Sequence, residues 1–379
     1  MSDSKFKVSF TLKQHTPIIH FQSEQVGATL RATELKPKFD KFLKKYAFNN
    51  KIPKNYKIKD DKDALDYKVN IEAQNKQIVA FEKYPPLYFA RDSKEKVQTD
   101  NLTISFISFQ TDLIQIIKDN FEAFLANTNF GSRQSKGYGC FYIKDKKFNP
   151  NLVAKDKTKM YCFNSTLNSY ENDIKLFYGF LRAGINEVDF RTKTSRFYAK
   201  SLMFLYANSL GITWDKKAIK EHFLNHKQPS NHHLMKDLLG LSTNESWKFK
   251  DKQEYLGLNI KKSSKSIDRY ASPILFKPIL EDNVVKIYFF ASSINKEFLN
   301  QHFSIHSKGK PLQISTPKEF DIDQFLKHSF NVDIDKHIDK KYHKHKNFLK
   351  LVNIFKTLKA QVWQRLTLCF KVVVWIMMS

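Results

Sequence analysis

Cysteine is scarce in this sequence, with 3 residues in 379, and no two of them lie close together. They are Cys140, Cys162 and Cys369, so no CxxC pair exists. This spacing excludes a disulfide framework and a cysteine-based zinc site. The first residues, MSDSKFKVSF, also lack an apolar run and a small-residue cleavage site, so we expect a cytoplasmic protein rather than a secreted one.

Long uninterrupted apolar segments are also absent. The most apolar stretch, residues 366–378, is interrupted by Lys371 and is shorter than the ~20 residues that cross a bilayer. A buried closing strand or helix is the favoured interpretation, and an oligomer contact or a non-native end are the alternatives. The basic residues 336–350 before it leave contact with a membrane surface as a rival reading, although we expect no membrane partner.

Acidic residues are outnumbered, because 64 Lys and Arg stand against 38 Asp and Glu and give a formal net charge of +26. An excess of this size indicates a polyanionic partner, with nucleic acid ahead of anionic membrane. Hydrophobic residues make up 41% of the chain, so the charge belongs to a folded protein rather than to a disordered tail. The length predicts about two or three domains.

Residues 1–150 have the pattern of one α+β domain. Alternating apolar and polar residues predict three strands, at 5–12, 102–109 and 140–143. Apolar residues at helical spacing predict two helices, at 35–43 and 112–125, and the charged stretch 51–66 reads as a loop or insertion. This order favours an antiparallel sheet with its helices on one side.

The pattern changes beyond residue 150. We expect a helical region at 151–260, with helices at 176–182, 197–210, 217–225 and 233–239. Strand patterns return in a second α+β portion, residues 261–379, at 273–279 and 284–290, and residues 321–350 are expected to be helical. The predicted fold class is therefore α+β, with two antiparallel-sheet domains and a helical insertion.

The segment GSRQSKGYG, residues 131–139, carries most of the chemistry, since it holds 3 of the chain's 10 glycines. Glycine admits positive φ and lets successive backbone N–H groups approach a phosphate, and Arg133 and Lys136 add positive charge. An ordinary turn between a helix and a strand explains the segment about equally well. The GxxxxGK[ST] spacing of a nucleotide-binding loop is absent, which disfavours nucleotide hydrolysis.

Three motifs, HTPIIHF at 15–21, GATLRATELKPKFDKFL at 27–43 and GSRQSKGYGCF at 131–141, occur in the order typical of one family. In this order they resemble the RAMP superfamily of CRISPR type III systems, whose members open with a strand ending in a Thr-Pro turn, continue with a Leu-Lys segment entering a helix, and close with a basic glycine loop. A weaker similarity, RYASPILFKP at 269–278, points to the Cmr-type (type III-B) subunit that caps one end of the effector complex.

The resemblance implies two ferredoxin-like (RRM-like) domains and a place in an RNA-guided antiviral complex. It implies a non-catalytic subunit that contacts the phosphate backbone of guide RNA or of the guide–target duplex. The implied partners are the CRISPR guide RNA, the target RNA and other RAMP subunits, with no cofactor, metal or small-molecule substrate.

The predicted RNA contacts form two groups. The first lies around the glycine loop and the Leu-Lys segment, and consists of Arg31, Lys36, Gly131, Arg133, Lys136, Gly137 and Tyr138. The second is a basic cluster in the helical region, namely Arg182, Arg191, Lys193 and Arg196. Tyr138 could stack on a base, but packing in the core is the favoured reading, and a solvated helix face explains the second group nearly as well.

Two rival functions remain. Some RAMP proteins cut CRISPR repeat RNA without metal, and His15 and His20 flank the Thr-Pro turn as a possible general base and acid. A metal site is the other rival, because a ligand-rich run contains Asp333, Asp335, His337, Asp339, His343 and His345. Its spacing does not bring these side chains to one helical face, so a charged surface helix is favoured. Asp60, Asp61 and Asp63 lie among lysines and read as solvated.

Overall fold

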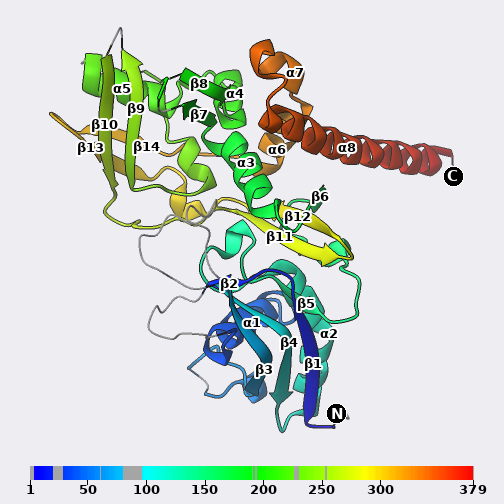
Figure 1. Cartoon of the computed structure of the whole chain (residues 1–379). Coiled ribbons are helices and arrows are strands. Elements are labelled where there is room, and N and C mark those ends of the chain that lie inside the picture. The colour runs from blue at the N-terminus through cyan, green and yellow to red at the C-terminus, as the bar shows by residue number, and fades with distance from the viewer. Residues whose placement is uncertain are drawn as a thin grey trace. The chain divides into compact units, whose positions relative to one another are not determined.

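The computed structural model describes residues 4–19, 29–59, 61–79, 96–189, 191–192, 194–225, 230–251 and 254–378 (Figure 1). The chain divides into two compact units. The first unit comprises Met1–Lys155, Asn164–Asn172 and Leu275–Phe289, and the second comprises Asp156–Phe163, Asp173–Ile274 and Phe290–Ser379.

The first unit has the βαββαβ order of a ferredoxin-like fold. The elements that form it are β1 (Lys7–Gln14), α1 (Ala32–Tyr46), β3 (Lys68–Val79), β4 (Lys96–Ile107), α2 (Thr111–Asn127) and β5 (Phe141–Ile143). The strands pair antiparallel in the order β3-β4-β1-β5, and the short β2 (Ile18–Ile19) pairs with the start of β4. This sheet confirms the antiparallel fold that the sequence predicts.

The core of this unit lies between the sheet and its two helices. Phe106 of β4 and Phe39 of α1 have ring centroids 5.6 Å apart, and Phe121 of α2 lies 5.0 Å from Phe106. All three side chains are fully buried. Because both helices contact the same strand residue, they pack on one face of the sheet, as the alternating pattern predicts.

Strand β3 and the two-residue strand β2 are the elements of this sheet that the sequence patterns did not predict. The side chains of β3 are exposed or half-buried, and its sequence, KVNIEAQNKQIV, is largely polar. An edge strand with little buried surface carries only a weak period-two signal. The predicted loop at 51–66 is confirmed, apart from the short 3-10 helix η1 (Lys54–Tyr56).

A second sheet repeats part of the ferredoxin-like plan. It has the order β11-β12-β6, from β11 (Ile274–Glu281), β12 (Val284–Ala291) and β6 (Tyr161–Ser165), and helix α3 (Tyr170–Arg182) follows β6 in the chain. A strand followed by a helix and then a hairpin, with the hairpin's second strand beside the first strand, is the opening half of the ferredoxin-like order. The predicted strands at 273–279 and 284–290 are confirmed as β11 and β12.

The residues between α3 and β11 hold strands as well as helices. Their elements are β7 (Ile185–Asp189), β8 (Thr194–Ala199), α4 (Leu202–Ser209), α5 (Asp215–Asn225), the 3-10 helix η4 (Lys236–Leu239), β9 (Asn244–Asp251) and β10 (Glu254–Ser263). The helix predicted at 197–210 is wrong for its first residues, because 197–199 belong to β8 and pair with β7. The helix starts only after Ser201, whose hydroxyl accepts the N–H of Phe204.

The last part of the chain adds two strands and three helices. They are β13 (His302–His306), β14 (Leu312–Ser315), α6 (Ile322–Asn331), α7 (Ile334–His337) and α8 (Lys346–Met378). The apolar residues 366–378 thus continue a helix, one of the two forms expected for them. None of the helices in the described part of the chain combines the length and apolarity that a bilayer crossing requires.

Candidate nucleic-acid interface

The glycine loop runs from Gly131 to Gly139, with the short 3-10 helix η2 (Gln134–Lys136) at its tip. Gly131, Gly137 and Gly139 have φ values of 77°, 90° and 63°, a region that glycine alone adopts without strain. A Cβ at Gly139 would lie 2.0 Å from the carbonyl oxygen of Phe130. The glycines are therefore required by the turn geometry and by close backbone packing at the base of the loop.

The Thr16-Pro17 turn holds the last residues of the loop, Gly137 to Gly139. Thr16 donates from Oγ1 to the carbonyl of Gly137 at 2.6 Å, and the same oxygen accepts the Cys140 N–H at 3.0 Å. The Gly139 N–H donates to the carbonyl of Pro17 at 2.8 Å. A single threonine hydroxyl thus fastens the loop to the end of β1.

Helix α1 holds the start of the loop, at Gly131. The Gly131 N–H donates to the Glu34 carboxylate at 2.7 Å, and the Lys38 ammonium bridges Glu34 at 2.7 Å and the side-chain oxygen of Gln134 at 2.9 Å. Glu34 and Lys38 are one helical turn apart and so share a face. The structure therefore brings together all three motifs that are far apart in the sequence.

A buried lysine joins the two ends of the loop. Lys277 of β11 is fully buried and donates to the carbonyl of Thr128 and to Asn129 Oδ1, each at 3.1 Å, and to the carbonyl of Phe141 at 3.5 Å. These acceptors are neutral, and burial lowers the pKa of the Lys277 ammonium. The residue comes from the sequence segment 269–278, so this segment supports the loop.

The tip of the loop is its accessible part. Arg133 is exposed, whereas the ammonium of the half-buried Lys136 is itself buried. Gly131, Gly137 and Tyr138 are buried as well. Arg133 also has a left-handed φ of 57°, which costs a residue other than glycine about 1 kcal/mol or more. Surrounding contacts therefore hold a fixed turn whose exposed cation is Arg133.

Tyr138 serves the core, which confirms the favoured reading of its role. Its ring is 1% exposed, and its hydroxyl donates to the Glu171 carboxylate at 2.9 Å. Lys96 also contacts Glu171, with 3.2 Å between the charged atoms. A ring enclosed in this way cannot stack on a base.

Lys36 and Arg31 lie at the start of α1, and their contacts differ from those of Lys38. The Lys36 ammonium donates to the Asp40 carboxylate at 2.9 Å and to the Leu65 carbonyl at 2.7 Å, and it lies 3.8 Å from the centre of the Tyr67 ring. Two residues of a helix differ by about 200° in direction, so Lys36 points away from the loop that Lys38 contacts. Arg31 is the N-cap residue, and its carbonyl accepts the N–H groups that open the helix.

The second predicted group lies in the second unit and divides into two kinds of residue. Arg182 is engaged internally, since it donates to the Gly240 carbonyl at 2.7 Å and to the Asp237 carboxylate at 3.3 Å. Arg191 and Arg196 are exposed on the β7–β8 hairpin, where Asp189 accepts from the Arg196 guanidinium. Lys193 lies outside the described residues.

His15 has the setting of a structural histidine. Its Nδ1 accepts the Leu280 N–H at 3.0 Å, and burial, together with the nearby positive charge of Lys277 and Lys13, lowers its pKa to about 3. A ring that is neutral at physiological pH and already bonded is poorly suited to general acid–base catalysis. His20, its predicted partner in RNA cleavage, lies outside the described residues.

The histidines of the ligand-rich run serve packing and backbone bonding. His337 and His343 bond the carbonyls of Lys200 and Ile338 through Nε2, each at 2.9 Å, and His345 stacks on the Phe197 ring. Over the part of the chain that the structure describes, no group of His, Cys, Asp and Glu is placed to hold a metal ion. Asp63 pairs with two lysines, Asp61 is exposed, and Asp60 lies outside the described residues.

Several residues that shape the loop were not predicted from the sequence. Glu34, Lys38, Asn129 and Lys277 all contact the loop or its ends, but none was identified as part of the site. The spacing of Glu34 and Lys38 was the available signal, since oppositely charged residues four apart mark one helical face. No local pattern indicates that Lys277 would be buried beside a loop well over a hundred residues earlier in the chain.

Comparison with known proteins gives the family. A model of the Cmr1 N-terminal domain matches residues 5–185, and a model of the Cmr1 C-terminal domain matches residues 198–360. No curated protein matches the sequence significantly. A structure of apo Cmr1 from Pyrococcus furiosus is similar, with a TM-score of 0.41 and 10% identity over 78% of this chain and 92% of that one.

A RAMP protein described as binding different RNA substrates is also similar, with a TM-score of 0.21 and 13% identity over 82% of this chain and 100% of that one. The assignment itself rests on the two domain models, which follow one another along the chain and together match most of its residues. The chain therefore belongs to the Cmr1 family, whose members are Cmr-type RAMP subunits of type III CRISPR systems, and the predicted resemblance is confirmed.

Proposed function

We propose that this chain is a non-catalytic, cytoplasmic RNA-binding subunit of a type III effector complex, which contacts the phosphate backbone of guide RNA or of the guide–target duplex. The partners in this proposal are the two RNA strands and the neighbouring RAMP subunits. Base pairing between the strands would supply the sequence specificity, and the protein would supply affinity through phosphate contacts.

The observation that carries the proposal is the fixed tip of the glycine loop. Arg133 is exposed on a turn that Thr16, Glu34 and Lys38 hold in place, and Lys136 lies on the same turn with its ammonium buried. A preorganised cation such as Arg133 loses little conformational entropy when a phosphate binds, so it contributes more affinity than a mobile lysine. Of the second group, Arg191 and Arg196 remain candidates, whereas Lys36, Arg182 and Tyr138 support the fold.

We propose that the chain is non-catalytic because His15 is unsuited to acid–base chemistry. A histidine that accepts a backbone N–H and has a pKa of about 3 lacks the proton that a general acid donates near neutral pH. We therefore favour binding over the rival reading in which this chain cuts CRISPR repeat RNA.

The test is reversal of the two tip charges, in the variant Arg133→Glu with Lys136→Glu. We expect RNA affinity to fall at least about tenfold at moderate salt. The neutral variant Arg133→Gln with Lys136→Gln should lower the slope of log affinity against log salt by about 1.4, at about 0.7 per phosphate contact for single strands. Filter binding over a salt series measures both quantities.

The matched control reverses two lysines that are exposed in the 51–66 loop, Lys54→Glu with Lys62→Glu, and so makes the same change in net charge. If the control lowers affinity as much as the tip variant, affinity reflects net charge alone and the loop has no specific role. Unchanged affinity in the tip variant would sink the proposal directly.

A further inference from the structure

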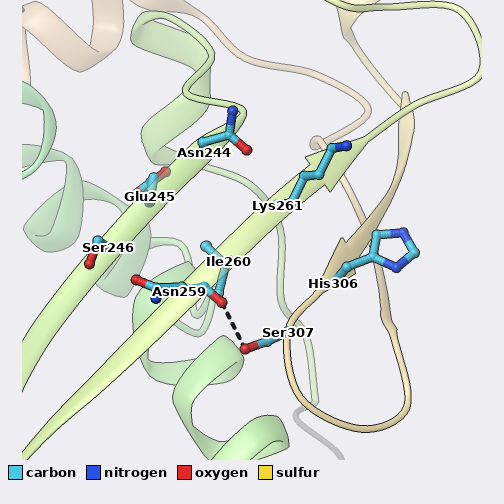
Figure 2. Close-up of a pocket in the computed structure, with 8 residues that line it drawn as sticks. All are labelled: Asn244, Glu245, Ser246, Asn259, Ile260, Lys261, His306 and Ser307. Atoms are coloured by element: carbon cyan, nitrogen blue, oxygen red, sulfur yellow. Dashed lines mark hydrogen bonds between the residues drawn. The ribbon is translucent and has the colours of Figure 1, made fainter.

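The second unit contains a four-stranded antiparallel sheet whose two faces differ in chemistry. The strand order is β14-β13-β10-β9, and Lys261 of β10 lies between His306 of β13 and Asn244 of β9. Asn259, two residues earlier on β10, lies opposite Ser246. Because side chains alternate between the faces of a strand, these five residues share one face, called here the outer face (Figure 2).

The inner face carries the acidic residues. Lys262, the next residue after Lys261, is fully buried and bonds Asp237 and Glu245, each at 2.5 Å. Lys236 also donates to Glu245. These pairs neutralise the carboxylates within the unit, and the described side chains of the outer face include no carboxylate.

A pocket of about 490 Å³ lies on the outer face (Figure 2). Its lining includes the side chains that can donate hydrogen bonds, namely Asn244, Ser246, Asn259, Lys261, His306 and Ser307. Ser307 donates to the carbonyl of Asn259 at 2.8 Å, which ties the end of β13 to β10. Glu245 also borders the pocket, but its carboxylate is bonded to the two lysines of the inner face.

Two further lysines follow the pocket residue Ser307 in the sequence. Lys308 and Lys310 are exposed on the turn that joins β13 to β14, directly after Ser307. No ion pair involves either of them or Lys261 within the described residues. The outer face and its adjoining turn therefore carry positive charge that no carboxylate of the described chain compensates.

We propose that this outer face is a second RNA-binding surface, which takes the sugar–phosphate backbone of single-stranded RNA without preference for particular bases. Lysine, serine and asparagine are the side chains that contact phosphates and sugars in protein–nucleic acid complexes. Bases stack best on Phe, Tyr and Trp, and the residues that line the pocket include none of these. A protein partner is disfavoured for a related reason, since protein interfaces centre on aromatic and apolar anchors.

This inference extends the proposed RNA-binding role but does not depend on the glycine loop. The two surfaces lie in different units and use different residues. Each can therefore be removed by itself, and the failure of one leaves the other open to test.

The test uses the full chain with Lys261, Lys308 and Lys310 all changed to Gln. Affinity for oligouridine and for oligoadenine should fall by about tenfold, and by the same factor for both RNAs. The slope of log affinity against log salt should decrease by about 2, because three phosphate contacts are lost. Cross-linking to 4-thiouridine RNA, read by mass spectrometry, should label peptides from β10 and β13 in the unaltered chain and in the Arg133→Glu, Lys136→Glu variant.

The control changes Lys54, Lys62 and Lys336 to Gln, which removes the same charge from exposed positions outside both surfaces. Equal losses in the two triple variants would overturn the proposal, as would an unchanged affinity and salt slope. An outer-face variant that binds RNA normally but no longer retains a neighbouring subunit would show that the face binds protein instead. Thermal unfolding should be unchanged in both variants, since the replaced side chains are exposed.

Discussion

Glycine conformation at the base of the basic loop sets where its cationic tip stands. Gly131 approaches the backbone of β2, and Gly139 approaches the backbone of Phe130, so neither position has room for a side chain. Gly211, after α4, is also left-handed at φ 68°, but no atom of the described chain lies within 4 Å of the Cβ it would acquire. Substitutions at these two kinds of glycine therefore distinguish the free-energy cost of backbone strain from the cost of a steric clash.

We predict that Gly139→Ala destabilises the protein by at least about 3 kcal/mol, because a clash adds to left-handed strain. Gly211→Ala should cost only about 1–2 kcal/mol, since strain acts there alone. Urea denaturation of the two variants measures the difference. Equal free energies of unfolding would mean that the loop base is less tightly packed than the 2.0 Å approach to Phe130 indicates.

His15 predicts a pH dependence of stability. Its pKa is about 3 in the folded chain and about 6.5 when unfolded, so between these values the unfolded chain binds the extra proton. Stability is therefore lost as the pH falls from 6.5 towards 3, by at most about 1.4 kcal/mol per pH unit. His15→Gln, which does not titrate, should show a smaller loss between pH 7 and pH 5 in urea denaturation. Parallel curves for the two proteins would contradict the assignment.

At the scale of elements, strand β10 places two neighbouring lysines in opposite environments. Lys261 faces outward, whereas Lys262 is fully buried between Asp237 and Glu245. Lys236 completes the inner group, and burial, together with the charge of Lys262, lowers its pKa to about 8. The buried face of β10 is apolar at Leu258 and Ile260 and becomes ionic at Lys262.

We predict that Lys262→Met destabilises the protein by about 3–5 kcal/mol, since it leaves buried carboxylates with fewer partners. The control is Lys217→Met on α5, where an exposed lysine is 3.8 Å from Glu221 and should contribute less than about 1 kcal/mol. Guanidinium denaturation reports both values. A cost below about 1 kcal/mol for Lys262→Met would show that the ionic group is better solvated than its burial indicates.

At the scale of the whole molecule, net charge overstates the positive surface that is available to RNA. The chain carries a formal charge of +26, yet several lysines bond to groups within the protein, namely Lys36, Lys38, Lys262 and Lys277. The cations that remain accessible include Arg133 at the loop tip, the arginines of the β7–β8 hairpin and the lysines beside the outer face of the four-stranded sheet. Composition identifies the class of partner, and the fold selects which charges can meet it.

Much of the fold was predictable where buried surface is regular. Both helices of the first unit and the strands β1, β4, β5, β11 and β12 have strong apolar periods, and the structure confirms them. The polar edge strand β3 was not predicted, because its exposed faces weaken the period-two pattern. The pair β9–β10 was not predicted either, although apolar residues alternate in both strands, at Trp247 and Phe249 and from Leu256 to Ile260. The helix predicted from residue 197 overlapped β8, because a short hairpin before a helix leaves little local signal.

The sequence by itself determined the excess of positive charge, the order of the three motifs and the family that this order resembles. Only the tertiary structure decided that Lys38 rather than Lys36 reaches the loop, that Tyr138 is enclosed, and that Lys277 joins the loop's ends. Local spacing specifies which residues share a face of a helix or strand. Which face meets which partner depends on packing between segments far apart in the chain, and that information is not local.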